Sequence, residues 1–314
     1  MTLGLGMAAI GRPHYINVRT NTVAKSNVNE LKTEGFKVLD EAYKLGVRYF
    51  DTAPGYGLAE KLLIEWLANK SDKTIEVATK WGYTYVANFD ANAPVHELKE
   101  HSLFKLKEQW QESKKLLPFL TTYQIHSATL DTGVLKNEAV LNELYHLKNE
   151  CNLKIGISTT GENQVEVIKK ALDVVVEGKP LFETFQSTYN FLDQSILTMS
   201  DTLKQANKRL IIKEALANGR MFKNAKYPEY QAFYNVLESL SSKYDVGVDA
   251  IALQFCASTI PEAVVLSGAS TVKQLQENLK MNSFHLTEDD LNRLKTFKVT
   301  PEKYWKERKQ LKWN

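Results

Sequence analysis

Three polar residues end short apolar runs in the first part of this 314-residue chain, and a tyrosine follows the turn after the first run. Together the four residues have the chemistry to move a proton. The run VRYFD ends in Asp51, the turn after it leads to Tyr56, and two later runs end in Lys80 and His126. An ammonium group near a phenol favours the phenolate and eases release of the phenolic proton. A carboxylate can hold that ammonium by an ion pair, and an imidazole can donate a hydrogen bond to a carbonyl oxygen. Such a set protonates an oxygen on which negative charge develops, as carbonyl reduction requires when a hydride donor binds beside it.

Each of these residues, taken alone, also has an ordinary structural explanation. Asp51 can cap a helix, and Tyr56 can pack at a rim. Lys80 can reach solvent from a strand end, and His126 can be a hydrogen-bonded core histidine. The set becomes significant only if the elements that carry it are neighbours, so the interpretation depends on the fold.

Short β-rich runs alternate with longer amphipathic segments along most of the chain, which is the pattern of repeated βα units. The expected strands are 2–8, 47–51, 74–80, 121–126, 154–158, 182–187, 209–214 and 263–267. Helices are expected near 30–46, 57–70, 96–115, 134–150, 162–176, 195–207, 228–257 with an interruption around Gly247, and 271–281. Eight such units predict an α/β fold, a single-domain (β/α)8 TIM barrel over residues 1–314. A doubly wound open sheet is the alternative, because counts of strands and helices do not show closure.

In a barrel, the C-terminal ends of the strands form one mouth, and active sites lie there. Asp51, Lys80 and His126 end the second, third and fourth expected strands. Consecutive barrel strands are neighbours, so these side chains should converge with Tyr56 on one small volume.

The segment GLGMAA at residues 4–9 matches the GxGxxA form of the dinucleotide-binding fingerprint. Its context does not fit, because only three residues precede Gly4 and because Gly11 and Pro13 would stop the helix that must follow. A glycine-rich first barrel strand is the preferred interpretation.

The composition argues against several classes of partner. The chain has 40 Lys and Arg against 37 Asp and Glu, a net charge of +3 that is too balanced to make nucleic acid or an anionic membrane the leading partner. No uncharged apolar stretch approaches the ~18 residues that a membrane span needs. The two cysteines, Cys151 and Cys256, lie far apart, and the histidines lack a metal-binding spacing, so neither a disulfide framework nor a metal site is expected. Together with a start that lacks the basic region of a signal peptide, these features predict a cytoplasmic protein.

Around the four polar residues the sequence resembles the aldo-keto reductase family. The matching segments are GLGMAAIG (4–11), GVRYFDTAPGYGLAE (46–60), VATKWG (77–82), YQIHS (123–127), KIGIST (154–159), FQSTYN (185–190), LANGRM (216–221) and GASTVKQLQENL (268–279). The resemblance implies a tetrad of Asp51, Tyr56, Lys80 and His126, with Tyr56 as general acid in reduction and general base in oxidation. It also implies an NAD(P)H-dependent oxidoreductase that interconverts a small aldehyde, ketone or aldose and the corresponding alcohol or lactone by direct hydride transfer.

The resemblance further implies a nicotinamide cofactor, usually NADPH with NADH as the alternative, laid extended across the barrel mouth. Ser158 and Gln186 match the positions that hydrogen-bond the carboxamide of this cofactor. Lys273 is an additional candidate for the 2′-phosphate, because a cation and a helix start both favour an anion. The positions that match those near the adenosine phosphate and adenine are Ser270, Gln274 and Asn278, and the other expected cofactor-binding residues are Gly6, Asp51, Leu216 and Gly219. The expected substrate-binding residues are Tyr56, His126 and Trp81, and Trp81 and Tyr83 are the candidates for an aromatic wall of the pocket, with ordinary packing at the rim as the alternative.

The chain departs from the family in several places, and two further segments bear on the substrate mouth. Where the family commonly has an aromatic residue followed by Ser-Pro-Leu, this chain reads Lys213-Glu-Ala-Leu216, which removes the usual partner for stacking on the nicotinamide. The N-terminal hairpin that usually plugs the barrel bottom is reduced, so another element or a partner subunit must cover that end. The loop of about 11–29 is long and polar and is expected either to shape the substrate mouth or to be mobile. The resemblance implies that the tail Pro301–Asn314 lines the substrate pocket, although a surface helix with an aromatic seam fits the tail equally well.

Three other functions stay open at this point. An aldose dehydrogenase would use the same residues in the oxidative direction. A regulatory subunit would keep the cofactor site, although the intact tetrad disfavours it. An aldolase-type enzyme would use Lys80 as a Schiff-base nucleophile, which Asp51 argues against because an ion pair keeps the amine protonated. Substrate, direction and oligomeric state are not determined by the sequence.

Overall fold

Eight parallel strands close into a barrel in the computed structural model, which describes residues 2–18, 28–90 and 92–313. Around the barrel the strand order is β1-β12-β11-β10-β7-β6-β3-β2. These strands are β1 (Thr2–Gly6), β2 (Tyr49–Asp51), β3 (Glu76–Trp81), β6 (Leu120–Ala128), β7 (Lys154–Thr159), β10 (Phe182–Thr188), β11 (Arg209–Lys213) and β12 (Val264–Ser267). All eight expected strands are confirmed with ends shifted by at most two residues, and the closed sheet excludes the doubly wound alternative.

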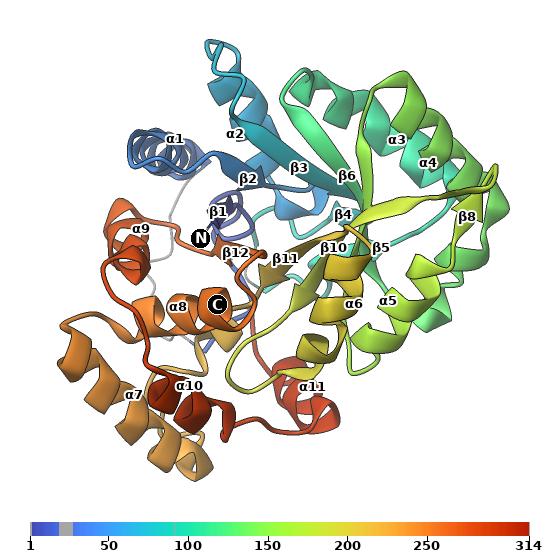
Figure 1. Ribbon diagram of the computed structural model, residues 1–314. Coiled ribbons are helices and arrows are strands. Elements are labelled where there is room, and N and C mark those ends of the chain that lie inside the picture. Colours follow the sequence, from blue (N-terminus) through green and yellow to red (C-terminus); the bar gives the residue numbers. More distant parts are fainter. Residues whose placement is uncertain (1, 19–27, 91, 314) are drawn as a thin grey trace.

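Helices surround the barrel and bury their apolar faces against it (Figure 1). They are α1 (Val28–Lys44), α2 (Ala59–Leu67), α3 (Leu103–Ser113), α4 (Glu138–Glu150), α5 (Gln164–Leu172), α6 (Ser200–Gln205), α7 (Gln231–Tyr244), α8 (Val248–Thr259), α9 (Val272–Leu279), α10 (Glu288–Lys295) and α11 (Pro301–Lys309). In α1, for example, Leu31, Val38 and Ala42 recur at helical spacing and are buried. The expected interruption near Gly247 is confirmed, because that residue is the N-cap of α8.

Parts of three helix predictions are wrong. The segment expected as a helix from residue 96 begins instead with β5 (Glu97–Lys99), which pairs antiparallel with β4 (Tyr83–Tyr85). The end of the 162–176 prediction forms β8 (Val175–Val176), paired with β9 (Lys179–Pro180), and the 195–207 segment starts as a 3-10 helix before α6. In both hairpins pairing with a second strand overrides a weak helical pattern.

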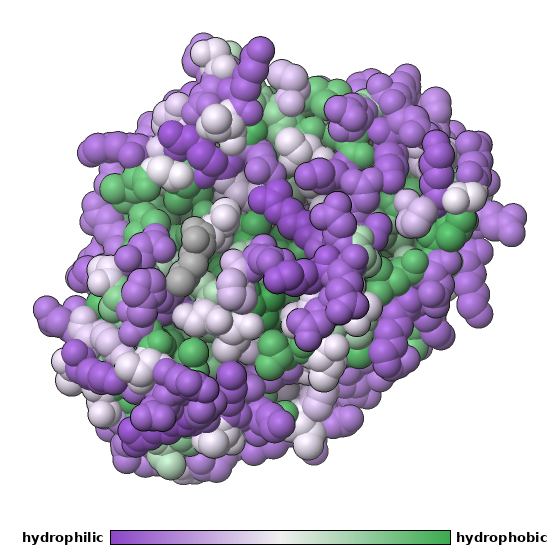
Figure 2. Space-filling model, in the orientation of Figure 1, coloured by the Kyte–Doolittle hydropathy of each residue, from purple (hydrophilic) through white to green (hydrophobic). Residues whose placement is uncertain are grey.

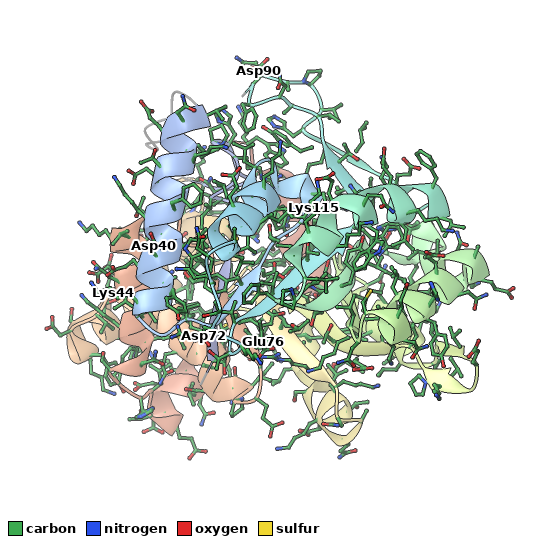
Figure 3. The ribbon with its side chains drawn as sticks, turned by 90° about the horizontal axis from the view of Figure 1, so that it is seen from above. Asp40, Lys44, Asp72, Glu76, Asp90 and Lys115 are labelled. Atoms are coloured by element: carbon green, nitrogen blue, oxygen red, sulfur yellow. The ribbon has the colours of Figure 1, made fainter. Side chains whose placement is uncertain are left out.

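Side chains of the chain itself fill the bottom of the barrel. The ring of Tyr49 lies under Gly4, where an added Cβ would come within 2.8 Å of the ring. Arg209, at the start of β11, forms an ion pair with Glu76, at the start of β3, and its Cζ lies 4.9 Å from the centroid of the Tyr49 ring. In Figure 3, Asp90, which belongs to the loop between β4 and β5, lies at the top of the view, and Glu76 lies well below it, next to Asp72. The Tyr49 ring and this ion pair thus pack the interior at this end of the barrel, and Gly4 has a packing role.

The face of the molecule that Figure 2 draws is mainly polar. Figure 2 shows hydrophilic side chains over most of one face, with smaller apolar areas between them. Within the part of the chain that the structure describes, no helix is long and apolar enough to cross a membrane.

Candidate active site

The C-terminal ends of the barrel strands surround a cavity of about 1120 Å³. Asp51 at the end of β2, Tyr56 in the 3-10 turn after it and His126 in β6 all line the cavity. Lys80 of β3 lies behind them and is fully buried. The four residues predicted from the strand ends therefore come together, and the cavity extends from them to the start of α9.

Asp51 and Lys80 form a buried ion pair at the base of the site. Lys80 Nζ also donates a hydrogen bond to the Thr52 carbonyl oxygen at 3.0 Å. The other carboxylate oxygen of Asp51 accepts from Gln186 Nε2 at 2.7 Å and from Gln124 Nε2 at 3.5 Å. Burial lowers the pKa of Lys80, and the Asp51 carboxylate opposes that shift. These contacts hold the ammonium in one position.

Tyr56 and His126 present their polar atoms to each other, with Tyr56 Oη 3.4 Å from His126 Nε2. Burial raises the pKa of Tyr56 well above its usual value, the Asp51 carboxylate adds to the rise, and the Arg12 guanidinium opposes it. Burial and the charge of Lys80 lower the pKa of His126 well below its usual value. Burial therefore outweighs the effect of the nearby Lys80 ammonium, which by itself favours the phenolate, and the net pKa of Tyr56 is raised. At neutral pH the pair consists of a protonated phenol and a neutral imidazole, each able to donate to one oxygen.

Arg12, which the sequence analysis missed, supports the turn that carries Tyr56. It is buried, its Nη1 donates to the Gly55 carbonyl oxygen at 3.0 Å, and it forms an ion pair with Glu97. Its Cζ lies 5.3 Å from the centroid of the Tyr56 ring. An added Cβ on Gly11 would come within 2.2 Å of the Tyr56 carbonyl oxygen, so the loop after β1 fits tightly against this turn. That loop lines the cavity as far as the structure describes it, and its residues 19–27 lie outside the described ranges.

Most of the expected cofactor-binding residues line the cavity. They are Gly6, Asp51, Ser158, Gln186, Leu216, Gly219, Ser270, Gln274 and Asn278. Ser158 Oγ accepts a hydrogen bond from the Ser127 backbone at 2.7 Å, which leaves its own proton to donate. Lys273 is exposed in the first turn of α9 and is not part of the cavity wall, so its role stays a prediction.

Hydrogen bonds fix the wall of the cavity at the start of α9. Thr271 caps this helix by accepting from the Gln274 backbone at 3.2 Å, and Gln274 Oε1 accepts from the Ser270 backbone at 2.9 Å. The Asn278 amide lies 2.7 Å from Ser267 Oγ. Thr271 is therefore the N-cap of α9, and the same residues shape the wall.

The expectation that Trp81 lines the substrate pocket is wrong. Successive side chains of a strand point to opposite faces, so Lys80 lies inside the barrel and Trp81 lies outside it. Trp81 is fully buried, with its ring 5.6 Å from that of His101. Of the two aromatic candidates for the pocket wall, Tyr83 does line the cavity, and its ring lies 4.7 Å from that of His126.

The C-terminal helix contributes a charged part of the wall. Glu214, after β11, accepts two hydrogen bonds from Arg308 of α11 at 2.9 and 2.7 Å. A buried Arg220 holds this helix through Glu307 at 3.1 Å. Arg308 and Trp313 line the cavity, whereas Tyr304 and Trp305 are buried, so the tail forms both a packed aromatic seam and a wall of the mouth. The described residues contain no cluster of three or more His, Cys, Asp or Glu that could hold a metal ion.

Comparison with known proteins gives one consistent match. A family model described as "Aldo/keto reductase family" matches residues 2–298. The chain is 25% identical over 301 residues to an "Uncharacterized oxidoreductase YqkF" of Bacillus subtilis (strain 168), covering 84% of this chain and 88% of that protein. It is 29% identical over 254 residues to an L-galactose dehydrogenase of Arabidopsis thaliana, covering 76% of this chain and 75% of that protein.

Solved structures with the same fold include two bacterial enzymes. The holo form of an aldo-keto reductase from Bacillus halodurans has a TM-score of 0.70 at 22% identity, covering 95% of this chain and 92% of the other. A glycerol dehydrogenase of Gluconobacter oxydans has a TM-score of 0.71 at 20% identity, covering 94% of this chain and 90% of the other. At these identities the likeness shows the fold alone.

Proposed function

Since this chain belongs to the aldo/keto reductase family and is an oxidoreductase, we propose that it interconverts a carbonyl compound and an alcohol by direct hydride transfer. The carbonyl compound is an aldehyde, a ketone or an aldose, and the reaction product of an aldose in the oxidative direction is the lactone. Tyr56 is the general acid in reduction and the general base in oxidation.

One observation carries this proposal, namely the 3.4 Å separation of Tyr56 Oη and His126 Nε2 at the wall of the cavity. A carbonyl oxygen placed on the cavity side of this pair, at hydrogen-bond distance from both atoms, would accept a hydrogen bond from each. The oxygen gains negative charge as its carbon is reduced, and the Tyr56 proton neutralises that charge. The Lys80 ammonium, whose Nζ lies 4.9 Å from the centroid of the Tyr56 ring, stabilises the phenolate that remains. Asp51 holds Lys80 in place for this role.

The cavity fits an extended nicotinamide dinucleotide, which when bound supplies or accepts the hydride. Its length from the Tyr56 turn to the capped start of α9 and its volume of about 1120 Å³ suit such a ligand. Ser158 has a hydroxyl proton to donate to the carboxamide oxygen. Gln186 uses its Nε2 on Asp51, which leaves its Oε1 to accept from the carboxamide nitrogen. NADPH is the expected cofactor and NADH the alternative, with Ser270, Lys273, Gln274 and Asn278 at the adenosine end.

The oxidation of an aldose is the second candidate function. The L-galactose dehydrogenase of Arabidopsis thaliana is 29% identical over 254 residues, so a sugar is a natural first substrate to test. A phenolate at Tyr56 would accept the hydroxyl proton in this direction, using the same groups in reverse.

Fluorescence titration with NADPH and NADH, followed by a panel of aldehydes, ketones and sugars in both directions, tests the proposal. In the variant Tyr56→Phe, cofactor binding should persist while turnover falls by about three orders of magnitude or more. Turnover that survives in this variant would remove Tyr56 from its role. Tight cofactor binding without turnover of any compound in the panel would favour a regulatory subunit.

A further inference from the structure

Lys213 stands out among the cations of the cavity wall because of how it is held. It is the last residue of β11 and lines the cavity, and its Nζ donates to Thr188 Oγ1 at 2.9 Å. Within the described residues no carboxylate lies within 4.0 Å of this nitrogen. The other two cations of the wall, Arg12 and Arg308, each form an ion pair with a carboxylate.

The acid next to Lys213 in sequence makes no direct ion pair with it, and Thr188 connects the two by accepting from Lys213 Nζ and donating to Glu214 Oε2 at 3.4 Å. Glu214 makes both of its short charged contacts to Arg308, at 2.9 and 2.7 Å, and also accepts from Tyr304 Oη at 3.3 Å. The group of Lys213, Glu214 and Arg308 therefore carries one net positive charge at this wall. A positive charge held in a site with little water acts strongly on any charge that appears nearby.

The strand register relates Lys213 to the residues proposed to hold the carboxamide. Gln186 of β10 is the register partner of Ile211 in β11, and Thr188 is the partner of Lys213. Lys213 thus lies on the neighbouring strand, two residues closer to the barrel mouth than the partner of Gln186. A ring held by its carboxamide at Ser158 and Gln186, with its hydride carbon towards the Tyr56 and His126 pair, would lie within the reach of the Lys213 ammonium.

We propose that Lys213 makes the site discriminate between the two redox states of the nicotinamide, favouring the reduced form. The oxidised ring carries a positive charge that the reduced ring lacks, so an unneutralised ammonium repels the oxidised form alone. The tighter-bound state is then the neutral one, and the bound oxidised ring becomes a stronger hydride acceptor. This inference rests on the proposed function, and its consequence is measurable without turnover.

The electrostatic surroundings of Lys213 agree with a charge that is present at neutral pH and lost just above it. Burial lowers the pKa of Lys213 to about 8; Glu214 and Asp193 oppose the shift, and Arg308 and Lys80 add to it. Glu214 stays ionised throughout, because Arg308 and Lys213 hold its pKa at about 2.

The test is to measure the dissociation constants of NADPH and NADP⁺ by fluorescence titration at pH 6.5 without substrate. In Lys213→Met, the ratio of the NADP⁺ constant to the NADPH constant should fall by about tenfold. Lys213→Arg keeps the charge and should keep most of the ratio. Lys115→Met, at an exposed surface position labelled in Figure 3, is the matched control and should leave the ratio unchanged.

A second measurement uses pH. In the wild type the ratio should fall as pH rises from 6.5 to 9.5 and approach that of Lys213→Met, whose ratio should be flat. If both forms of the cofactor bind and Lys213→Met leaves the ratio unchanged, this inference is wrong and the proposed function stands. If the wild type binds none of the four cofactor forms NADPH, NADP⁺, NADH and NAD⁺, the proposed function itself is wrong.

Discussion

Gln186 of β10 donates a hydrogen bond to Asp51 of β2 across the full width of the barrel, at 2.7 Å. In the closed strand order β10 and β2 are four places apart, so they stand opposite each other. Arg209 of β11 and Glu76 of β3 are related in the same way at the other end of the barrel. Contacts between opposite strands therefore cross the interior at both ends of the barrel. The contact at the mouth includes Asp51 of the proposed catalytic site.

Replacement of Gln186 by Leu should affect both stability and cofactor binding. A hydrogen bond to a buried carboxylate contributes about 1.5–3 kcal/mol, so the free energy of unfolding should fall by about 2 kcal/mol. The affinity for NADPH should also fall, because the proposed carboxamide acceptor is removed. Urea denaturation and fluorescence titration measure the two effects. Gln231→Leu, at an exposed position of α7, is the control, and equal losses in the two variants would contradict the prediction.

Replacement of Lys80 by Met should destabilise the protein by about 3–5 kcal/mol, since it leaves the buried Asp51 carboxylate without its cation. The double variant Asp51→Asn, Lys80→Met should recover part of this loss, because the unpaired charge is gone. Turnover should be lost in both variants, since neither has the Lys80 ammonium beside the Tyr56 ring. Urea denaturation measures the free energy of unfolding of both variants. A Lys80→Met variant as stable as the wild type would contradict the prediction.

The sequence predicts the barrel and the tetrad well because their signals are local. Each of Asp51, Lys80 and His126 directly ends or lies at the end of an apolar run, and consecutive strands of a barrel are neighbours. The sequence does not predict which face of β3 carries Trp81, because an aromatic residue suits either face. Only the packing shows that Trp81 lies outside the barrel. Tyr83 reaches the cavity only because residues that continue a helical pattern form the hairpin β4–β5 instead.

Contacts over long sequence separations explain the rest of what was missed. Arg12 and Glu97 are 85 residues apart, and no spacing rule connects a loop residue to a hairpin residue at that distance. Lys213 was recognised as unusual from its position after the seventh strand. Its neighbour Glu214 forms an ion pair with Arg308 of the C-terminal helix, and the sequence does not predict this contact between distant residues.

Glu60 should make stability depend on pH. It is buried in α2 and accepts hydrogen bonds from Thr79 Oγ1 at 2.6 Å and Ser113 Oγ at 2.9 Å. Burial raises its pKa to about 7, against these hydrogen bonds, from its usual value of 4.5. The pKa of Glu60 is higher in the folded than in the unfolded protein, so protonation of Glu60 favours the folded state. The stability that this protonation contributes is complete below about pH 4.5 and is lost as pH rises through about 7.

In Glu60→Gln, this loss should be absent. Between pH 5 and pH 8.5, the free energy of unfolding of the variant should therefore rise by about 2 kcal/mol relative to that of the wild type. Urea denaturation at the two pH values measures the difference. Glu65→Gln, at an exposed position of the same helix, serves as the control. A wild type and a Glu60→Gln variant that change in parallel with pH would contradict the assignment.

Arg12 should act on turnover through the position of Tyr56. Its bond to the Gly55 carbonyl oxygen at 3.0 Å and its ion pair with Glu97 fix the turn that carries the phenol. We expect Arg12→Met to lower kcat by about 10–100-fold, since a small displacement of a proton donor has effects of this size. KM should change less, because the cofactor and the carbonyl oxygen still have their other contacts. The measurement is steady-state turnover of 4-nitrobenzaldehyde with NADPH.

A double variant separates this role from a general loss of stability. If Arg12 acts only by positioning Tyr56, then adding Arg12→Met to Tyr56→Phe should lower the residual turnover no further. Arg48→Met is the matched control, since the Arg48 guanidinium also lies against a tyrosine, with its Cζ 4.1 Å from the Tyr43 ring centroid, but outside the cavity wall. Additive losses in the double variant would show that Arg12 contributes to turnover independently of Tyr56, and the positioning role would then be rejected.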